Sequence, residues 1–440
     1  MPFTLSRRHA AVLVLLLVVV AGPDRLATQR QTTTTPPRRE MTFFNARIID
    51  GDGKLVATNG VIRVRDGRIA VVSDARIETS PNAPGIVDLG GRTVMPGMVN
   101  AHGHVADTRG LQSGAQFYTE ANLLDQLRRY AGYGVTTVVS LGGDADAGFK
   151  LQDAQATPAL DRARLFVAGP VITGATPEAA RKEVDRVAAM KPHVIKIRVD
   201  DNLGTATKMP IEVSTAVIEQ AHKHGLRVAA HVFYLADAKA LLRAGVDFIA
   251  HSIRDVPVDD ELIGLLKARD VCVCPTLMRE VSTFVYESEP DFFKDPFFLR
   301  SADPAVLGEL RDPKRQAQVR ANKSAQRYKI ALDVALANTK KLFDAGVSIA
   351  SGTDTGPPGR FQGYFEHMEL GLLAKAGLKP ADILASATGT AARCSKLADV
   401  GFLRPGQWAD FIVLSGNPLE DVTRTKTLEA VYVAGNRLSR

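Results

Sequence analysis

In the middle of the chain stands the stretch Val194-Ile195-Lys196-Ile197-Arg198-Val199, which has the length and the β-branched composition of a short buried strand. Successive side chains of a strand point to opposite faces, so the two isoleucines share one face while Lys196 and Arg198 share the other. If the isoleucines pack against helices, the lysine and the arginine point toward the interior of the fold.

Seven further apolar runs alternate with helical stretches in the same way. The eight runs cover residues 93–99, 136–140, 164–168, 194–199, 227–231, 248–251, 271–275 and 347–351. Strands that alternate with helices are typical of βαβ crossovers and a parallel sheet. Eight such units over about 260 residues fit a closed barrel. We therefore predict an α/β protein built on a (β/α)₈ TIM barrel.

The two ends of the chain have a different texture, with short alternating strands and tight turns. Near the N-terminus strands are predicted at 43–49, 60–64 and 68–72, and near the C-terminus at 409–414, 430–433 and 435–436. Two β-rich flanks around an α/β middle most simply pair with each other. We predict a small β-sandwich domain built from both chain ends, with its two parts at 41–92 and 399–440 and the barrel at 93–398.

Composition and charge exclude several classes of protein. The 440 residues are 45% hydrophobic and 23% charged, which is ordinary for a globular chain and excludes a disordered, collagenous or multi-span membrane protein. The net charge of +7 suggests a nucleic-acid partner at first. However, residues 1–40 contain six arginines against one aspartate and one glutamate, so more than half of that excess lies outside the predicted domains. We expect no nucleic-acid partner.

The first 31 residues have the pattern of a signal peptide. Arg7 and Arg8 precede an apolar run at 10–21, which is too short to span a bilayer comfortably, and Gly22 and Pro23 follow it. We predict export to the periplasm or beyond, by a general or a twin-arginine route, with no stable membrane span after processing. An uncleaved N-terminal anchor is the alternative. Residues 32–40 are rich in Thr, Pro and Arg, which predicts a flexible linker.

The cysteines are few: Cys272, Cys274 and Cys394. An odd, sparse set predicts no disulfide framework, and Cys-X-Cys within a strand is not the spacing of a zinc finger. We therefore expect stability to come from burial alone.

The longest interval between predicted strands follows Pro275. The aromatic pairs Phe292-Phe293 and Phe297-Phe298 lie in it. They could form an apolar lid over the barrel mouth, or they could belong to a helical excursion packed on the outside.

Polar groups collect where the predicted strands end, which is where barrel enzymes carry their active sites. His102 and His104 follow the first run, His231 and His251 close the fifth and sixth, and Asp354 follows the eighth. A single histidine at a strand end is commonly a satisfied polar residue, but five groups converging on one rim favour a metal site. Imidazole and carboxylate together suit zinc or a similar divalent ion.

Lys196 adds a further chemical possibility. Burial and nearby cations lower the pKa of a lysine, and a neutral amine can react with CO₂ to give a carbamate. A carbamate has two oxygens and a negative charge, so it could bridge two metal ions. An internal Lys-Asp pair is the alternative that the strand pattern leaves open.

These motifs together resemble the amidohydrolase superfamily, and more closely its imidazolonepropionase-like branch, which includes metal-dependent Xaa-Pro dipeptidases and ochratoxin-hydrolysing amidohydrolases. The resemblance covers residues 41–440 and rests on Met95-Pro96-Gly97-Met98-Val99-Asn100-Ala101-His102-Gly103-His104, Val194-Ile195-Lys196-Ile197, Ala230-His231, Ala250-His251-Ser252, Gly352-Thr353-Asp354 and Leu403-Arg404-Pro405-Gly406-Gln407-Trp408-Ala409-Asp410.

The resemblance implies two divalent metal ions, most simply Zn²⁺. It assigns the more buried ion to His102, His104 and Asp354, the more exposed ion to His231 and His251, and a bridging role to carboxylated Lys196. One departure concerns substrate: residues 169–177 lack the histidine-containing glycine-rich loop of many dipeptidase relatives, which puts a simple dipeptidase in doubt.

The implied reaction is hydrolysis of an amide C–N bond, with Asp354 as general base and then acid. Arg198 could bind a substrate carboxylate or pair with Asp200 or Asp201. Tyr234 could donate to the scissile carbonyl or pack at the rim, and His367 could bind substrate or support the site from behind.

Three functions follow from these residues. The first is a secreted binuclear amidohydrolase acting on an N-acyl amino acid, an Xaa-Pro-type dipeptide or a bulky aryl amide such as ochratoxin. The second uses the same metals on a lactone, carbamate or phosphotriester, and the third is a non-catalytic scaffold. We expect a small-molecule substrate, with a homo-oligomer as a possibility.

Overall fold

The computed structural model describes residues 40–75 and 83–439. The predicted signal peptide at 1–31, and the predicted linker up to residue 39, lie outside the described residues. Within the described part of the chain, no helix is both long enough and apolar enough to cross a membrane.

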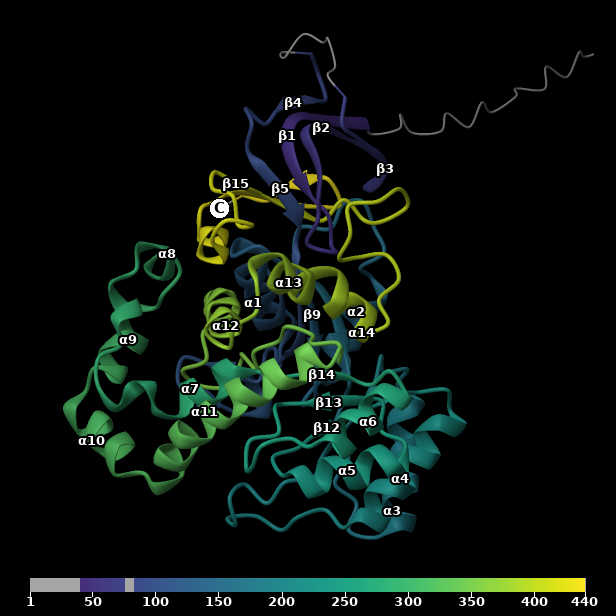
Figure 1. Cartoon of the computed structure of the whole chain (residues 1–440), viewed down its shortest axis with the longest axis vertical. Helices are drawn as coiled ribbons and strands as arrows, with labels where there is room; N and C mark the ends of the chain where they lie inside the picture. Colours follow the sequence, from purple (N-terminus) through teal and green to yellow (C-terminus); the bar gives the residue numbers. More distant parts are fainter. Residues whose placement is uncertain (1–39, 76–82, 440) are drawn as a thin grey trace, which may run out of the picture. The chain divides into compact units, whose positions relative to one another are not determined.

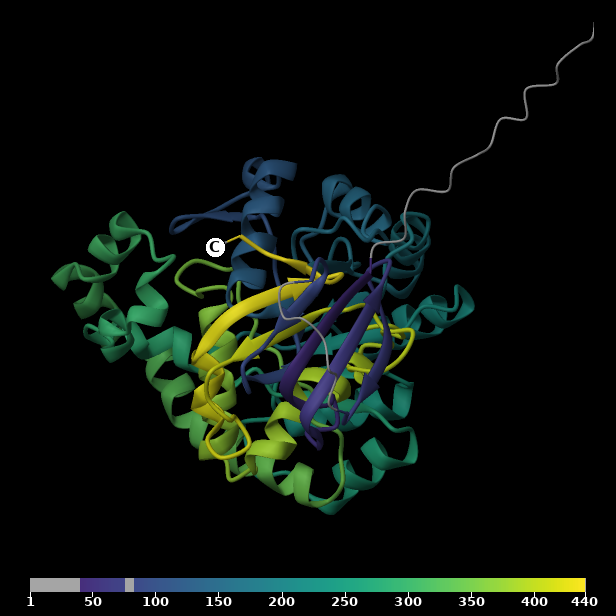
Figure 2. The ribbon, with the colours of Figure 1, turned by 90° about the horizontal axis from the view of Figure 1, so that it is seen from above.

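One sheet contains strands from both chain ends, which confirms the predicted small β domain. Its path is β17-β16-β15-β5-β1-β2-β3, with β4 paired to β1. The strands are β1 (Glu40–Ile49), β2 (Leu55–Arg65), β3 (Arg68–Ser73), β4 (Ile86–Asp88), β5 (Thr93–Pro96), β15 (Phe411–Leu414), β16 (Leu428–Val433) and β17 (Asn436–Arg437). Figure 2 shows the purple N-terminal strands beside the yellow C-terminal ones. Phe43, Phe411 and Tyr432 pack together inside this domain.

The predicted run 93–99 divides between the two domains. β5 pairs with β1 and β15 in the small sheet, whereas β6 (Met98–Gly103) begins the barrel. Gly97 stands between them, and a Cβ there would overlap the side chain of Thr136. The chain can therefore pass from one sheet to the other only because this residue has no side chain.

The barrel forms from two arcs of parallel strands. One arc has the order β10-β9-β6 and the other β11-β12-β13-β14. The further strands are β9 (Val135–Ser140), β10 (Arg164–Val167), β11 (Ile195–Arg198), β12 (Val228–His231), β13 (Phe248–Ala250) and β14 (Cys272–Cys274). Isolated parallel bridges join Ile172 to Ile197, Val273 to Ile349, and Gly103 to Thr355. The eighth run thus lies between β14 and β6, and the TIM-barrel prediction is confirmed.

Helices surround the strands, as Figure 1 shows. Their bounds are α1 (Glu120–Gly132), α2 (Asp146–Asp153), α3 (Pro177–Ala188), α4 (Ile211–Lys223), α5 (Leu235–Ala244), α6 (Asp260–Ala268), α7 (Leu277–Phe284), α8 (Pro296–Leu299), α9 (Pro304–Leu310), α10 (Pro313–Ala321), α11 (Lys323–Asp344), α12 (Tyr364–Lys375), α13 (Pro380–Ala385) and α14 (Ala391–Cys394). Sequence signals fix several starts: Thr119 and Thr176 accept from backbone N–H groups in the first turns of α1 and α3.

The long interval after Pro275 is a helical excursion with an apolar core of its own. It contains α7 to α11, and Figure 1 shows α8, α9 and α10 to one side of the barrel. Phe292, Phe293 and Phe298 are buried in one cluster with Tyr364 and Phe365 of α12. Of the two alternatives, the packed helical excursion therefore describes this segment.

The expectation of no disulfide is wrong. Cys272 of β14 and Cys394 of α14 form a disulfide, with 5.8 Å between their Cα atoms, and Cys274 stays a buried free thiol. The two partners are separated by 122 residues along the chain. Counting cysteines could not reveal the pair because only the closed barrel brings its base against α14.

Candidate metal centre

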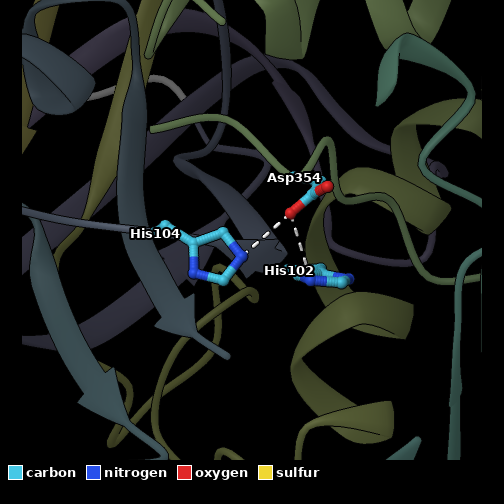
Figure 3. Close-up of side chains that lie close together, drawn as sticks. All are labelled: His102, His104 and Asp354. Carbon is cyan, nitrogen blue, oxygen red and sulfur yellow. Dashed lines mark hydrogen bonds and ion pairs between the residues drawn. The ribbon is translucent and has the colours of Figure 1, made fainter. Parts of the chain in front are cut away.

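Three predicted ligands meet at the mouth of the barrel. His102 and His104 lie at the end of β6, and Asp354 follows the eighth run. One ligand atom from each lies within 4.8 Å of the other two. The Nε2 atoms of His102 and His104 are 3.4 and 2.8 Å from the same oxygen, Oδ1 of Asp354, as Figure 3 shows. This arrangement offers two imidazoles and a carboxylate to one ion.

The other two histidines lie beside this group. The ring centroids of His102 and His251 are 4.5 Å apart, and those of His251 and His231 are 4.1 Å apart. Their nitrogens already have partners: His231 Nε2 lies 2.6 Å from Asp200 Oδ2, and His251 Nδ1 lies 2.6 Å from Thr276 Oγ1. The structure therefore brings all four predicted histidines and Asp354 into one cluster.

His104 is oriented by the backbone on its far side. Its Nδ1 lies 3.0 Å from the carbonyl oxygen of Gly142, which can accept a hydrogen bond from that nitrogen. A donating Nδ1 leaves the lone pair on Nε2, the atom that faces Asp354. The loop that carries Gly142 is held in turn by the buried Asp144, which accepts from Ser140 Oγ and from two backbone N–H groups.

Lys196 lies in the same interior and is almost fully buried. Among the described residues its Nζ has no hydrogen-bond partner, so the Lys-Asp pair left open by the sequence is not formed. Burial lowers the pKa of this amine to about 8, against the raising effect of Asp354. A buried, unpartnered and readily neutralised amine beside four imidazoles fits a group that binds metal after carboxylation.

His102 fits the same interpretation. Its Nδ1 is buried without a hydrogen-bond partner in the described part of the chain. Burial, together with the charge of Lys196, holds the pKa of His102 well below its usual value. A neutral imidazole is the form that coordinates a metal ion.

Two site residues have left-handed backbone conformations, which L-residues other than glycine rarely adopt. The φ angles are +80° at His251 and +58° at Asp354, and Thr276, the partner of His251, has +48°. Such conformations persist only where surrounding contacts impose them, and they concentrate at functional sites.

A buried carboxylate holds the two ligand-bearing segments together. Oε1 of Glu366 on α12 accepts hydrogen bonds from Asn100 Nδ2 at 2.7 Å, Thr353 Oγ1 at 2.7 Å and Thr355 Oγ1 at 2.6 Å. Asn100 Oδ1 accepts in turn from the backbone N–H of His102. Thr353 and Thr355 flank Asp354, so this carboxylate fixes both segments that carry the ligands. We call it the Glu366 clamp.

Asp354 also has a cationic partner. Arg360 forms an ion pair with Oδ2, the oxygen that faces away from the histidines, and donates to the Asp354 carbonyl. Burial raises the pKa of Asp354, but the Arg360 charge and the His104 hydrogen bond outweigh it and hold that pKa well below its usual value. The carboxylate is therefore ionised and can accept a proton or bind a cation.

The predicted substrate residues lie in other environments. Arg198 Nε is 3.1 Å from Asp200 Oδ1, so the pairing with Asp200 is the alternative that is observed. Tyr234 donates to Asp201 Oδ1 at 2.8 Å. His367 is buried, with its ring nitrogens 2.9 Å from Thr425 Oγ1 and 2.8 Å from the Tyr133 carbonyl oxygen, and its described contacts include none of the clustered ligands.

Sequence reasoning did not single out four residues that contact the site. The strand pattern offers Asp200 only as a partner for Arg198, and it gives no role to Thr276, Arg360 or Glu366. Asp200 and Thr276 each lie two residues beyond the end of a strand, so their place at the carboxyl rim is a usable signal. Glu366 and Arg360 had none, because one is on a helix and the other in a loop.

Comparison with known proteins gives a consistent result. Residues 93–438 match the model of the family described as Amidohydrolase family. An imidazolonepropionase of Deinococcus radiodurans is 26% identical over 407 residues, which are 88% of this chain and 92% of that protein. An ochratoxinase of Aspergillus niger is 26% identical over 265 residues, which are 58% of this chain and 47% of that protein.

A solved structure extends the comparison to three dimensions. A proposed prolidase of Bifidobacterium longum superposes with a TM-score of 0.71 at 26% identity, covering 91% of this chain and 95% of that one.

Proposed function

Because the chain belongs to the amidohydrolase family, in its imidazolonepropionase-like branch, and is a metal-dependent hydrolase of C–N bonds, we propose that it cleaves an amide bond. The proposed substrate is an N-acyl amino acid, an Xaa-Pro-type dipeptide or a bulky aryl amide such as ochratoxin. The observation that carries this proposal is the convergence of His102, His104 and Asp354 beside the unpartnered amine of Lys196. The names of the relatives, which include a prolidase and an ochratoxinase, supply the substrate classes.

The proposed centre is binuclear. His102, His104 and Asp354 would hold one ion, His231 and His251 the other, and Lys196, carboxylated by CO₂, would contribute to both. Divalent ions bound there, Zn²⁺ by the donor set, would activate a water molecule and polarise the scissile carbonyl. A mononuclear centre would give no role to the buried Lys196 amine.

Asp354 carries the proton in this proposal. Its carboxylate is ionised in the resting site, so it can accept the proton of the attacking water at an oxygen that faces the histidines. It then passes the proton to the leaving nitrogen. Arg360 keeps the second oxygen in place throughout. Tyr234, at the rim and hydrogen-bonded to Asp201, remains a proposed donor to the substrate carbonyl.

The carboxylated lysine has its own test. Protein prepared with ¹³C-bicarbonate should give one carbamate carbon resonance, and Lys196→Met should abolish it. Lys267, an exposed-surface lysine that donates to the Ala345 carbonyl, supplies the matched control: Lys267→Met should keep the resonance. A wild-type spectrum without the signal at full metal content would exclude the carbamate.

Export is also part of the proposal. The leader pattern at 1–31 supports it, and the disulfide between Cys272 and Cys394 supports it independently, since disulfides persist in oxidising compartments. Fractionation of a producing bacterium should find the processed protein outside the cytoplasm. An unprocessed chain retained in the cytoplasm with free thiols would contradict export.

The substrate class is tested by one screen. Metal-loaded protein is offered N-acyl amino acids, Xaa-Pro dipeptides, aryl amides, lactones and phosphotriesters, with Asp354→Asn as the inactive comparison. We expect C–N hydrolysis to dominate. A dominant lactonase or phosphotriesterase activity would replace the proposal by the alternative use of the same centre.

A further inference from the structure

Two buried arginines share one carboxylate next to the metal ligands. Arg254 Nε lies 2.8 Å from Glu280 Oε1, and Arg279 Nη1 lies 3.2 Å from Glu280 Oε2. The exposed fractions of the three side chains are 0% for Arg254, 7% for Arg279 and 0% for Glu280. We call Arg254 and Arg279 the arginine pair. Two cations against one anion leave a buried excess of one positive charge.

Several donors of the arginine pair have partners. Arg254 Nη1 donates to the carbonyl oxygens of Val232 at 2.9 Å and Ser252 at 2.6 Å, and Arg279 Nη2 donates to Tyr328 Oη at 3.2 Å. In contrast, Arg254 Nη2 and Arg279 Nε have no hydrogen-bond partner among the described residues. Burying an uncompensated charge and unsatisfied donors is unfavourable, so these atoms call for a ligand or a functional reason.

Aromatic rings cover the faces of both guanidinium groups. The Arg254 guanidinium carbon is 4.6 Å from the ring centre of Phe233, and that of Arg279 is 4.1 Å from the ring centre of Tyr328. A guanidinium whose face is stacked keeps its N–H donors along its edge. The unpartnered atoms Arg254 Nη2 and Arg279 Nε lie on these edges.

The arginine pair lies on the rim of the barrel that carries His231 and His251. Arg254 comes three residues after His251, and Arg279 belongs to α7, directly after β14. The oxygens of Asp200 are engaged by His231 and Arg198, and among the described residues they form no hydrogen bond with the arginine pair.

We propose that the arginine pair is an anion subsite of the substrate pocket and binds the carboxylate of the leaving amine. The inference rests on the proposed function and deepens it, because it selects N-acyl amino acids and C-terminal dipeptides over neutral amides. It also relocates anion recognition: Arg198, for which the sequence left carboxylate binding and pairing with an aspartate both open, is held by Asp200, whereas the arginine pair has unsatisfied donors. A purely structural triad is the competing explanation, since buried ion pairs also occur without any ligand.

The test is a binding cycle on the metal-loaded enzyme. L-Proline, the leaving amine of such a substrate, and L-prolinamide, which lacks its carboxylate, have no scissile N-acyl bond; both are bound by calorimetry to the wild type and to Arg279→Met. We expect the acid to bind about 10 to 100-fold more tightly than the amide in the wild type, and this preference to collapse in the variant. A carboxylate can also bind the metals directly, but that contribution is the same in both proteins and cancels in the cycle.

A matched control separates recognition from general damage. Arg162 is equally buried and donates to the carbonyl oxygens of Ala163 and Leu151, at the amino end of β10 and so on the opposite rim. Arg162→Met should lower stability without changing the acid-to-amide ratio. If Arg279→Met does not fold, Arg279→Lys keeps the charge but loses Nε and the fork, and should reduce the ratio in part.

The outcomes are distinct. An acid-to-amide ratio near one in the wild type, or a ratio unchanged by either substitution at Arg279, overturns the subsite. If inorganic phosphate is preferred over neutral ligands by an equally large affinity ratio, the pair binds an oxyanion that is not part of the substrate. That result would also overturn the proposed substrate subsite. If no amide is hydrolysed but the ratio behaves as expected, the proposed function fails and the subsite stands.

Discussion

The two halves of the proposed metal centre are held in different ways. His102, His104 and Asp354 already lie within 4.8 Å of one another, and the Glu366 clamp joins the two chain segments that carry them. In the other half, Nε2 of His231 contacts Asp200 and Nδ1 of His251 contacts Thr276. The first half therefore presents three ligand atoms together before an ion arrives, whereas the second half presents two imidazoles without a shared carboxylate. We expect the first half to bind its ion more tightly.

Removing the carboxylate of the organised half should have the largest effect. Asp354→Asn deletes the proposed proton acceptor but keeps a ligand oxygen, so kcat should fall about a thousandfold while most of the metal remains bound. The measurement is kcat per bound metal, with the metal determined by elemental analysis. Asp399→Asn, a half-exposed aspartate paired with Arg68, is the control and should leave kcat unchanged. Turnover within tenfold of the wild type would remove Asp354 from proton transfer.

Removing the disulfide should weaken ion binding by the half of the centre that contains His231 and His251, because Cys272 and the backbone partner of His251 lie in the same strand. Cys272 lies in β14, and the backbone N–H of His251 donates to the Cys274 carbonyl of the same strand at 2.8 Å. Losing a crosslink over 122 residues, in Cys272→Ser with Cys394→Ser, should lower the free energy of unfolding by about 2 to 5 kcal/mol.

Denaturant unfolding with and without reductant measures this effect. The reductant should lower the wild-type midpoint and leave the double variant unaffected. If β14 transmits the change, the weaker of the two bound ions should be lost first on dilution. Equal loss of both ions would mean that the disulfide supports the barrel as a whole.

The Glu366 clamp can be compared with a neighbour on the same helix. Glu369 is also buried in α12, but its oxygens accept from the backbone N–H groups of Leu277 and Met278 rather than from ligand segments. Glu366→Gln weakens three hydrogen bonds beneath the ligands and should lower the affinity of the tighter ion about 10 to 100-fold, whereas Glu369→Gln should not.

Burial raises the pKa of Glu369 to about 8, so a neutral amide there replaces a group that is largely neutral at pH 7. Competition with a metal chelator gives the affinity, and thermal unfolding of the metal-free proteins shows whether the two variants lose similar stability. Equal chelator curves for the two variants would reduce the clamp to ordinary packing.

The sequence predicted which candidate ligands lie together better than it predicted their surroundings, for a physical reason. Parallel strands end at one rim, so His102, His231 and His251 could be gathered from strand positions alone. The position of a residue on a helix says less about whether it reaches the site. Glu366 and His367 are adjacent in sequence, yet Glu366 contacts the segments that carry the ligands, whereas His367 contacts Tyr133 and Thr425. The arginine pair joins the loop after β13 to α7, and the disulfide joins β14 to α14, so no local pattern encodes those contacts.

The smallest expected effect concerns the second half alone. Arg198 supports Asp200, which holds His231, but its side chain is 45% exposed, so solvent and salt screen the pair. Arg198→Ala should weaken the looser ion by no more than about fivefold, which corresponds to the upper range of about 1 kcal/mol for an exposed ion pair. The difference should shrink further at high salt, and the tighter ion should not respond. Chelator titration at two salt concentrations measures the affinities of both ions in one experiment. A large, salt-independent loss would mean that Asp200 needs Arg198 to stay in place, and the second half would then be as organised as the first.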